Sequence, residues 1–184
     1  MQIKYLEKWL GSPIPRRRRK AIRILTKHTI NSRYPLEKML PATKNALNDD
    51  DWKVRAVAIS SITNLALKYS SILEDVQNTL LSRLDEETHA NVKANILRGL
   101  AKLVEKYDIR DIDRIYNAGL SLLDSPNNDI KHGCLSVLAS IALKIEEKTG
   151  DIIEKFKDVI DTLPPLLKRD ALVFLRKMYL RFPD

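Results

Sequence analysis

The chain has 184 residues, of which 44% are apolar and 30% are charged, a balance typical of a folded domain with a continuous core. Its formal net charge of +8 at pH 7 favours anionic partners, and its single cysteine, Cys134, excludes an intramolecular disulfide. No apolar run is long enough to cross a membrane and the N-terminus has no secretory signal, so we expect a cytoplasmic, intracellular protein without a membrane partner.

Five stretches of the sequence line up on one another about 37 to 38 residues apart, and each contains an amphipathic run opened by an apolar–basic pair. The clear pairs begin at Val54, Val92, Ile130 and Leu167, and a weaker copy lies at Arg17–Arg18. A period of this length indicates stacked helical repeats. We therefore expect one all-α solenoid domain over residues 1–184. Its repeats are expected approximately at 1–33, 34–71, 72–108, 109–148 and 149–184.

Within each repeat, helical spacing of apolar residues predicts two helices, here termed the A and B helices. The first repeat is shortened, and Pro15 suits the first turn of its B helix, where the missing N–H costs nothing. In the second repeat, the run Asn48–Asp51 ends one helix and offers N-caps for the next. A buried stripe then follows at Val54, Val57, Ala58, Ile62 and Leu65. The B helices are expected at 16–30, 53–67, 91–105, 130–144 and 167–181.

The second repeat resembles the HEAT repeat. Leu40–Pro41, Leu47–Asp49 and Val54–Ile59 are similar to that family's helix-A proline, turn aspartate and Val-Arg start of helix B. The third and fourth repeats are similar but lack the proline, and the first and last depart further. The resemblance implies a right-handed α-α superhelix of about five hairpins, with A helices on the convex side and B helices lining the concave side.

The resemblance also implies a ladder of bonds between repeats. In this ladder, the basic residue of each apolar–basic pair bonds a turn aspartate of a neighbouring repeat. The residues at these positions are Arg18, Arg55, Lys93, Lys131 and Lys168.

Charge is segregated between the two expected layers. The B helices carry 19 basic and two acidic residues, a net charge of +17, and the rest of the chain carries −9. A positive concave layer attracts anionic partners. Helical phase places small or neutral residues on the outward face as well, among them Ala56, Ser60, Thr63, Ala94, Ala101, Ser136, Ala139 and Val173. The residues expected to contact a partner are Arg16, Arg19, Lys20, Arg23, Lys27, Arg98, Lys102, His132, Arg169, Arg176 and Lys177.

The first B helix is the most basic segment, and residues 1–33 alone account for +9. Arg16, Lys20, Arg23 and Lys27 fall on one helical face. Arginines at a helix start oppose the positive end of the helix dipole, which favours selection for binding over selection for stability. The alternative interpretation is a solvated polar cap of the kind that terminal repeats need.

No motif indicates catalysis, a metal or a cofactor, so we expect a protein that is not an enzyme. His28, His89 and His132 lie in different repeats, and Cys134 occupies a small core position. HEAT-like alkylpurine DNA glycosylases place aromatics and an aspartate on a basic concave face. Here we expect Trp52 to pack at a repeat edge instead, because the middle of the expected concave face has no aromatic platform.

These patterns predict a non-catalytic interaction scaffold whose basic concave face binds a protein partner, in particular an acidic one. The alternative is a nucleic-acid-binding protein that contacts phosphates through the concave Lys and Arg residues and the Arg16–Lys27 helix. Apolar side chains also crowd the last helix between Leu172 and Phe182. We therefore expect self-association, or docking into a larger assembly, through that helix.

Overall fold

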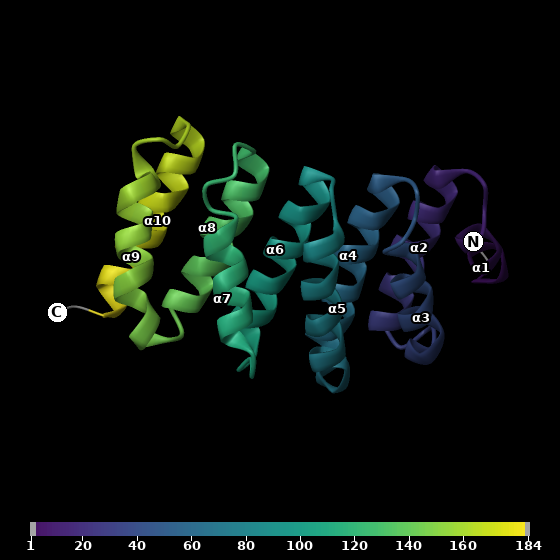
Figure 1. Ribbon diagram of the computed structural model, residues 1–184. Helices are drawn as coiled ribbons and strands as arrows, with labels where there is room; N and C mark the ends of the chain where they lie inside the picture. Colours follow the sequence, from purple (N-terminus) through teal and green to yellow (C-terminus); the bar gives the residue numbers. More distant parts are fainter. Residues whose placement is uncertain (1–2, 183–184) are drawn as a thin grey trace.

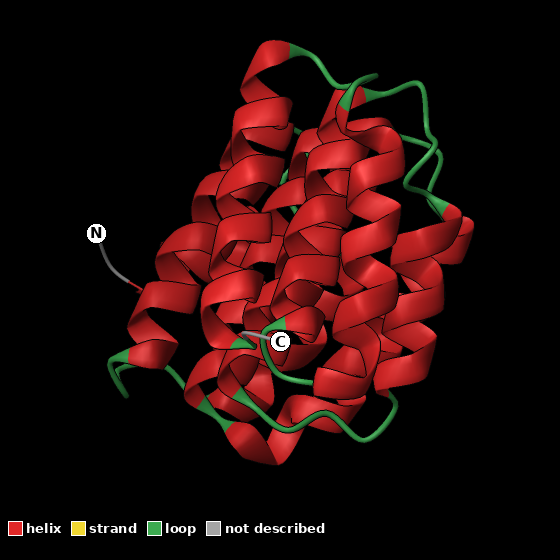
Figure 2. Ribbon diagram, turned by 90° about the vertical axis from the view of Figure 1, so that its left-hand side faces the viewer, coloured by secondary structure: helices red, strands yellow, loops and turns green. Residues whose placement is uncertain are grey.

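The computed structural model describes residues 3–182, which form ten α-helices, one 3₁₀ turn and no strand (Figures 1 and 2). The A helices are α1 (Ile3–Leu10), α3 (Leu36–Ala46), α5 (Leu73–Glu86), α7 (Ile112–Ser121) and α9 (Glu146–Ile160). The B helices are α2 (Pro15–Ile30), α4 (Trp52–Lys68), α6 (Ala90–Lys106), α8 (Asn128–Ala142) and α10 (Pro165–Arg181). The 3₁₀ turn η1 (Ser70–Ile72) precedes α5. No helix in this part of the chain is both long and apolar enough to cross a bilayer.

The helices stack as successive hairpins from the N-terminal to the C-terminal end (Figure 1). Each B helix packs against the B helices of its neighbouring repeats, whereas the A helices pack mainly on B helices and little on one another. The B layer is therefore the more closely spaced layer, as expected of the layer on the concave side of a solenoid, and its surface is called the concave face below. The all-α solenoid expected from the repeat period is confirmed.

The expected helix limits agree with the structure within two residues at most ends. Pro15 is the first residue of α2, as predicted. Asp51 caps α4, and its side chain accepts hydrogen bonds from the backbone N–H groups of Lys53 and Val54. However, α9 begins at Glu146, inside the stretch expected for the fourth repeat. The exact division into repeats stays a prediction.

The core runs between the two layers along the stack. The predicted stripe is fully buried at Val54, Ala58, Ile62 and Leu65, whereas its fifth member, Val57, is only half-buried and lines a surface groove. Cys134 is fully buried too, and this desolvation raises the pKa of its thiol to about 12, so the thiol stays protonated. Its predicted role as a small core residue is confirmed.

The expected ladder of basic residues and turn acids exists between the first three repeats. Arg18 donates through Nε and Nη2 to both carboxylate oxygens of Asp49, at 2.6 and 2.7 Å. Arg55 donates in the same way to Glu87, at 2.8 and 2.9 Å. Bidentate ion pairs of this kind hold adjacent hairpins in a fixed orientation.

The ladder does not continue as expected in the later repeats. The position equivalent to Asp49 and Glu87 is Ser125 in the fourth repeat, so a carboxylate is missing there. In residues 3–182, Lys93 and Lys131 make no bond of this type, and Lys168 instead bonds Asp161 at 2.6 Å within its own repeat.

A second set of inter-repeat bonds, which sequence reasoning missed, lies at the C-terminal ends of the B helices. The Tyr69 hydroxyl donates to the Thr29 carbonyl at 2.6 Å, and the Tyr107 hydroxyl donates to the Leu67 carbonyl at 3.0 Å. The Lys144 ammonium donates to the Val104 carbonyl at 3.0 Å. These bonds satisfy carbonyl groups that have no partner within their own helices.

Candidate functional site

The concave face is formed by equivalent positions on successive B helices, which align in three rows along the stack. In the structure these helices carry 20 basic and three acidic residues. The rows are Arg19, Ala56, Ala94, His132 and Arg169; Arg23, Ser60, Arg98, Ser136 and Val173; and Lys27, Asn64, Lys102, Ser140 and Lys177. Two of these residues, Ala94 and Ser140, are buried beneath the surface of the face.

The first repeat contributes a basic cluster, defined as Arg16, Arg19, Lys20, Arg23 and Lys27 of α2. Four of these side chains are exposed, Arg19 is half-buried, and none forms an ion pair within residues 3–182. The first four border a hollow of about 530 Å³ on the surface of α2. α2 has no acidic residue in its first turn and no side-chain cap. The predicted residues are therefore brought together, and their charges are left without counter-ions from the protein.

The aromatic ring of Trp9 lies beside this cluster. The Lys20 ammonium and the Arg17 guanidinium are 5.7 and 5.8 Å from the ring centroid, within range of a cation–π contact. Arg18, in the same basic run, points elsewhere and binds Asp49. That hydrogen bond raises the pKa of Arg18. Burial raises the pKa of Asp49, but its hydrogen bonds from Arg18 and from the backbone of Asp51 hold it below the ordinary value.

A groove of about 450 Å³ separates α2 from α4 on the same face. Arg23 and Lys27 border it from α2, and Ser60 and Asn64 border it from α4. Its apolar lining comes mainly from Ile30 and Val57. The groove is thus bordered by exposed positive charge on the α2 side and by uncharged polar residues on the α4 side, with apolar residues between them.

Two other predicted contact residues are held in a network that joins α6, α8 and α10. Arg98 donates through Nε to Nδ1 of His132 at 3.3 Å, and its Nη2 lies 3.7 Å from Asp129. The other ring nitrogen of His132, Nε2, lies 3.4 Å from Asp170. Arg98 also donates to Asn95 at 3.1 Å. Arg98 and His132 therefore have partners within the protein, unlike the basic cluster.

The remaining predicted contacts are exposed. Lys102, Arg169, Arg176 and Lys177 make no ion pair with any part of the chain that the structure describes. In contrast, the expectation that four small residues face outward is wrong: Thr63, Ala94, Ala101 and Ala139 are buried. They lie between neighbouring B helices, where only small side chains allow the helices to pack closely.

Trp52 is placed as predicted, at a repeat edge. Its ring stacks on the imidazole of His89, with centroids 4.2 Å apart. The pair joins the start of α4 to the start of α6, and Trp52 also packs against the core. Trp52 therefore presents no free aromatic platform on the concave face.

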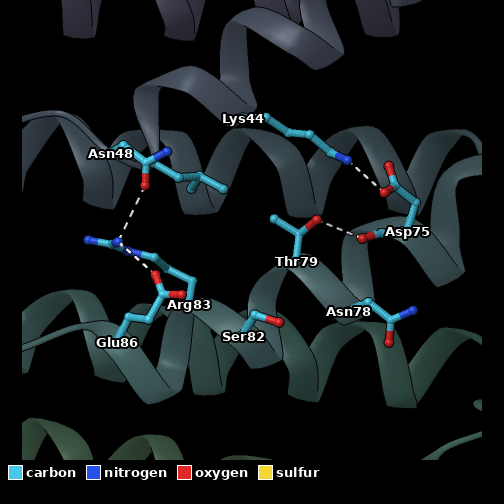
Figure 3. A pocket seen from close by; sticks show the side chains of 9 residues that line it. Lys44, Asn48, Asp75, Asn78, Thr79, Ser82, Arg83 and Glu86 are labelled. Carbon is cyan, nitrogen blue, oxygen red and sulfur yellow. Dashed lines mark hydrogen bonds and ion pairs between the residues drawn. The ribbon is translucent and has the colours of Figure 1, made fainter.

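The convex side has a polar groove of about 400 Å³ between α3 and α5 (Figure 3). Lys44 points to Asp75 across it, with 2.6 Å between the ammonium and the carboxylate. Arg83 lies between Asn48 and Glu86, 3.4 Å from each. Because its charges are paired with one another, this groove offers no net charge to a ligand. Within residues 3–182, no group of three or more His, Cys, Asp or Glu side chains is placed to hold a metal ion.

Comparisons with known proteins agree with this architecture. The family model described as HEAT repeat matches residues 39–69. A designed armadillo repeat protein is similar in structure, with a TM-score of 0.63 and 17% sequence identity, over 94% of this chain and 80% of that chain. Another, in complex with the peptide (KR)4, has a TM-score of 0.66 and 16% identity, over 98% and 88% of the two chains. No curated protein matches in sequence.

A chain of much greater length is also similar in structure. A Kap121p mutant has a TM-score of 0.66 and 22% identity, over 95% of this chain and 18% of that chain. At such identities these likenesses show the fold alone.

Proposed function

Since this chain is a HEAT/armadillo-like repeat protein, we propose that it is a non-catalytic scaffold that binds an acidic protein segment along its concave face. An intracellular, cytoplasmic location is part of the proposal and is supported by a single, buried cysteine.

The observation that carries the proposal is the unpaired basic cluster on α2. Each member has another member three or four residues away, so like charges repel one another along the helix surface. Arg16 also lies in the first turn of α2, where the helix dipole favours negative charge. An anionic partner offsets both of these unfavourable effects. Binding such a partner therefore explains the basic cluster, whereas a contribution to the stability of the isolated chain does not.

The rest of the concave face favours an extended protein segment as that partner. Beside the cluster, α4 presents Ala56, Ser60 and Asn64, which are small or uncharged and leave room for a backbone. The groove between α2 and α4 adds an apolar floor for a side chain. A designed armadillo repeat protein of this fold holds the basic peptide (KR)4. The free charges here are positive, which favours a peptide of the opposite charge.

Nucleic acid is the second candidate, because phosphate contacts need only suitably spaced lysines and arginines. Binding of single strands usually adds aromatic side chains on which bases stack. Here Trp52 is stacked on His89, and Trp9 is covered by Lys20 and Arg17. An acidic protein segment is therefore the better fit.

The test is fluorescence anisotropy of a labelled polyglutamate peptide titrated with the protein at low and physiological salt. We expect binding that weakens with salt, and at least about tenfold weaker binding by the double variant Arg16→Glu, Arg23→Glu. The matched control is Lys4→Glu, Lys155→Glu, which makes the same charge change at exposed positions on the A helices.

Equal losses in the two double variants would show that only net charge matters and would contradict the proposal. Failure of the wild type to bind the peptide would contradict the proposal as well. If a DNA duplex binds more tightly than the peptide and displaces it, and Arg16→Glu, Arg23→Glu abolishes that binding, the concave face is a nucleic-acid site instead.

A further inference from the structure

The C-terminal end of the stack exposes a concentration of apolar side chains. Of the seven large apolar side chains that are exposed within residues 3–182, five lie on α10. Leu172 is 51% exposed and Leu180 is 72% exposed, although Met178 of the same helix is fully buried. The five residues are Leu166, Leu172, Val173, Tyr179 and Leu180. Exposed apolar surface of this kind marks an interaction site more often than a free surface.

Two arginines run through the middle of this surface. Arg169 and Arg176 are two helical turns apart, and the 100° step of the helix places them between Leu172 and Tyr179 on one side and Val173 and Leu180 on the other. Neither arginine forms an ion pair in the described part of the chain. These two arginines and the five apolar residues are called the α10 face below.

A further hairpin stacked in the same register does not fit this face. The positions equivalent to Arg176 are Thr26, Thr63, Ala101 and Ala139, all small and buried against the next repeat. The positions equivalent to Tyr179 are Thr29, Ala66, Val104 and Ala142, which are also small and buried. An arginine and a tyrosine at these places prevent the close approach that the other B helices make.

A second copy of the chain fits poorly as well. A two-fold symmetric contact between two α10 helices centred on the face would place Arg169 of each copy near Arg176 of the other. Like charges held against each other in a desolvated contact oppose association. The same two arginines favour a partner that carries carboxylates.

We propose that the α10 face docks an acidic amphipathic helix of a partner protein. The two apolar rows repeat every seven residues, at Leu172 and Tyr179 and at Val173 and Leu180, which matches the apolar positions of a partner helix laid against α10. Carboxylates beside that apolar face pair with Arg169 and Arg176. This site is at the opposite end of the stack from α2 (Figure 1), so it is separate from the basic cluster.

The experiment measures binding of a labelled helical peptide with leucines along one face and glutamates elsewhere. The comparison peptide has the same composition, with the leucines distributed around the helix. We expect the amphipathic peptide to bind the wild type, and the double variant Leu172→Ser, Leu180→Ser to bind it at least about tenfold more weakly. Arg176→Glu is expected to weaken it too. The matched control is Tyr5→Ser, Ile14→Ser, which removes exposed apolar groups at the other end.

Equal binding of the two peptides overturns the proposal, as does absence of binding or binding that survives Leu172→Ser, Leu180→Ser. Sedimentation velocity tests whether the face binds a second copy of the chain. If the wild type sediments as a dimer and the variant Leu172→Ser, Leu180→Ser sediments as a monomer, the face mediates self-association instead. The variant Arg16→Glu, Arg23→Glu separates this site from the proposed function, because it is expected to lose polyglutamate and keep the amphipathic peptide.

Discussion

Replacing Glu87 by alanine is expected to lower the free energy of unfolding by about 3–5 kcal/mol, the cost of removing one partner from a buried ion pair. Glu87 is 2% exposed and lies between the second and third repeats. It accepts two hydrogen bonds from Arg55 and one from Arg83 at 3.1 Å. It also accepts from the backbone N–H groups of Thr88 and His89, at 3.1 and 2.9 Å. The alanine variant leaves both guanidinium groups without this acceptor.

The same carboxylate predicts how stability depends on pH. Burial raises the pKa of Glu87, but the hydrogen bonds from Arg55 and from the His89 backbone outweigh burial and lower it from 4.5 to about 2. A carboxyl group with a lowered pKa stabilises the fold fully above its unfolded-state value. That contribution, on the order of 3 kcal/mol, is lost as the pH falls from about 4.5 through 2.

Urea unfolding followed by circular dichroism measures both effects, at neutral pH and at a series of values down to acid. The conservative variant Glu87→Gln is expected to show a shallower decline in stability below pH 5 than the wild type. Glu86→Ala is the matched control: its side chain is 68% exposed, and we expect a change within about 0.5 kcal/mol. Parallel pH profiles for wild type and Glu87→Gln would show that Glu87 is not the group that titrates.

Replacing Gly133 by alanine is expected to lower the free energy of unfolding by about 1–3 kcal/mol, although alanine is the better helix former. Gly133 lies where α8 crosses α6. A Cβ atom there would lie 2.9 Å from Cβ of Leu97 and 3.2 Å from the backbone oxygen of Ala94. Because these atoms are close to the backbone, they cannot rotate away, and the two helices must separate.

Gly150 of α9 provides the matched control, since a Cβ added there meets no atom within 4 Å. Gly150→Ala is therefore expected to raise the free energy of unfolding by about 0.5–1 kcal/mol, through helix propensity alone. The two Gly→Ala variants should shift the urea midpoint in opposite directions. A gain in stability for both would contradict the close approach of α6 and α8.

Local sequence rules determined the helices and their order. Pro15 begins α2 and Asp51 caps α4, because both effects depend only on residues within one turn. The stripe from Val54 to Leu65 marks the buried face of α4, since helical periodicity is a property of the segment itself. The cluster from Arg16 to Lys27 was predictable for the same reason: all of it lies on one helix.

Only the tertiary structure decided which charges are free and which small residues are buried. Arg98 and His132 have the same outward phase as the basic cluster, but Asp129 and Asp170 reach them from other helices. Thr63 was expected to face outward and is covered by the next repeat. The periodicity of a helix defines its apolar face, but it does not say how closely a neighbouring helix approaches the edges of that face. That approach, set by the packing of the B helices, determines which cations of the concave face are free and which small residues are buried.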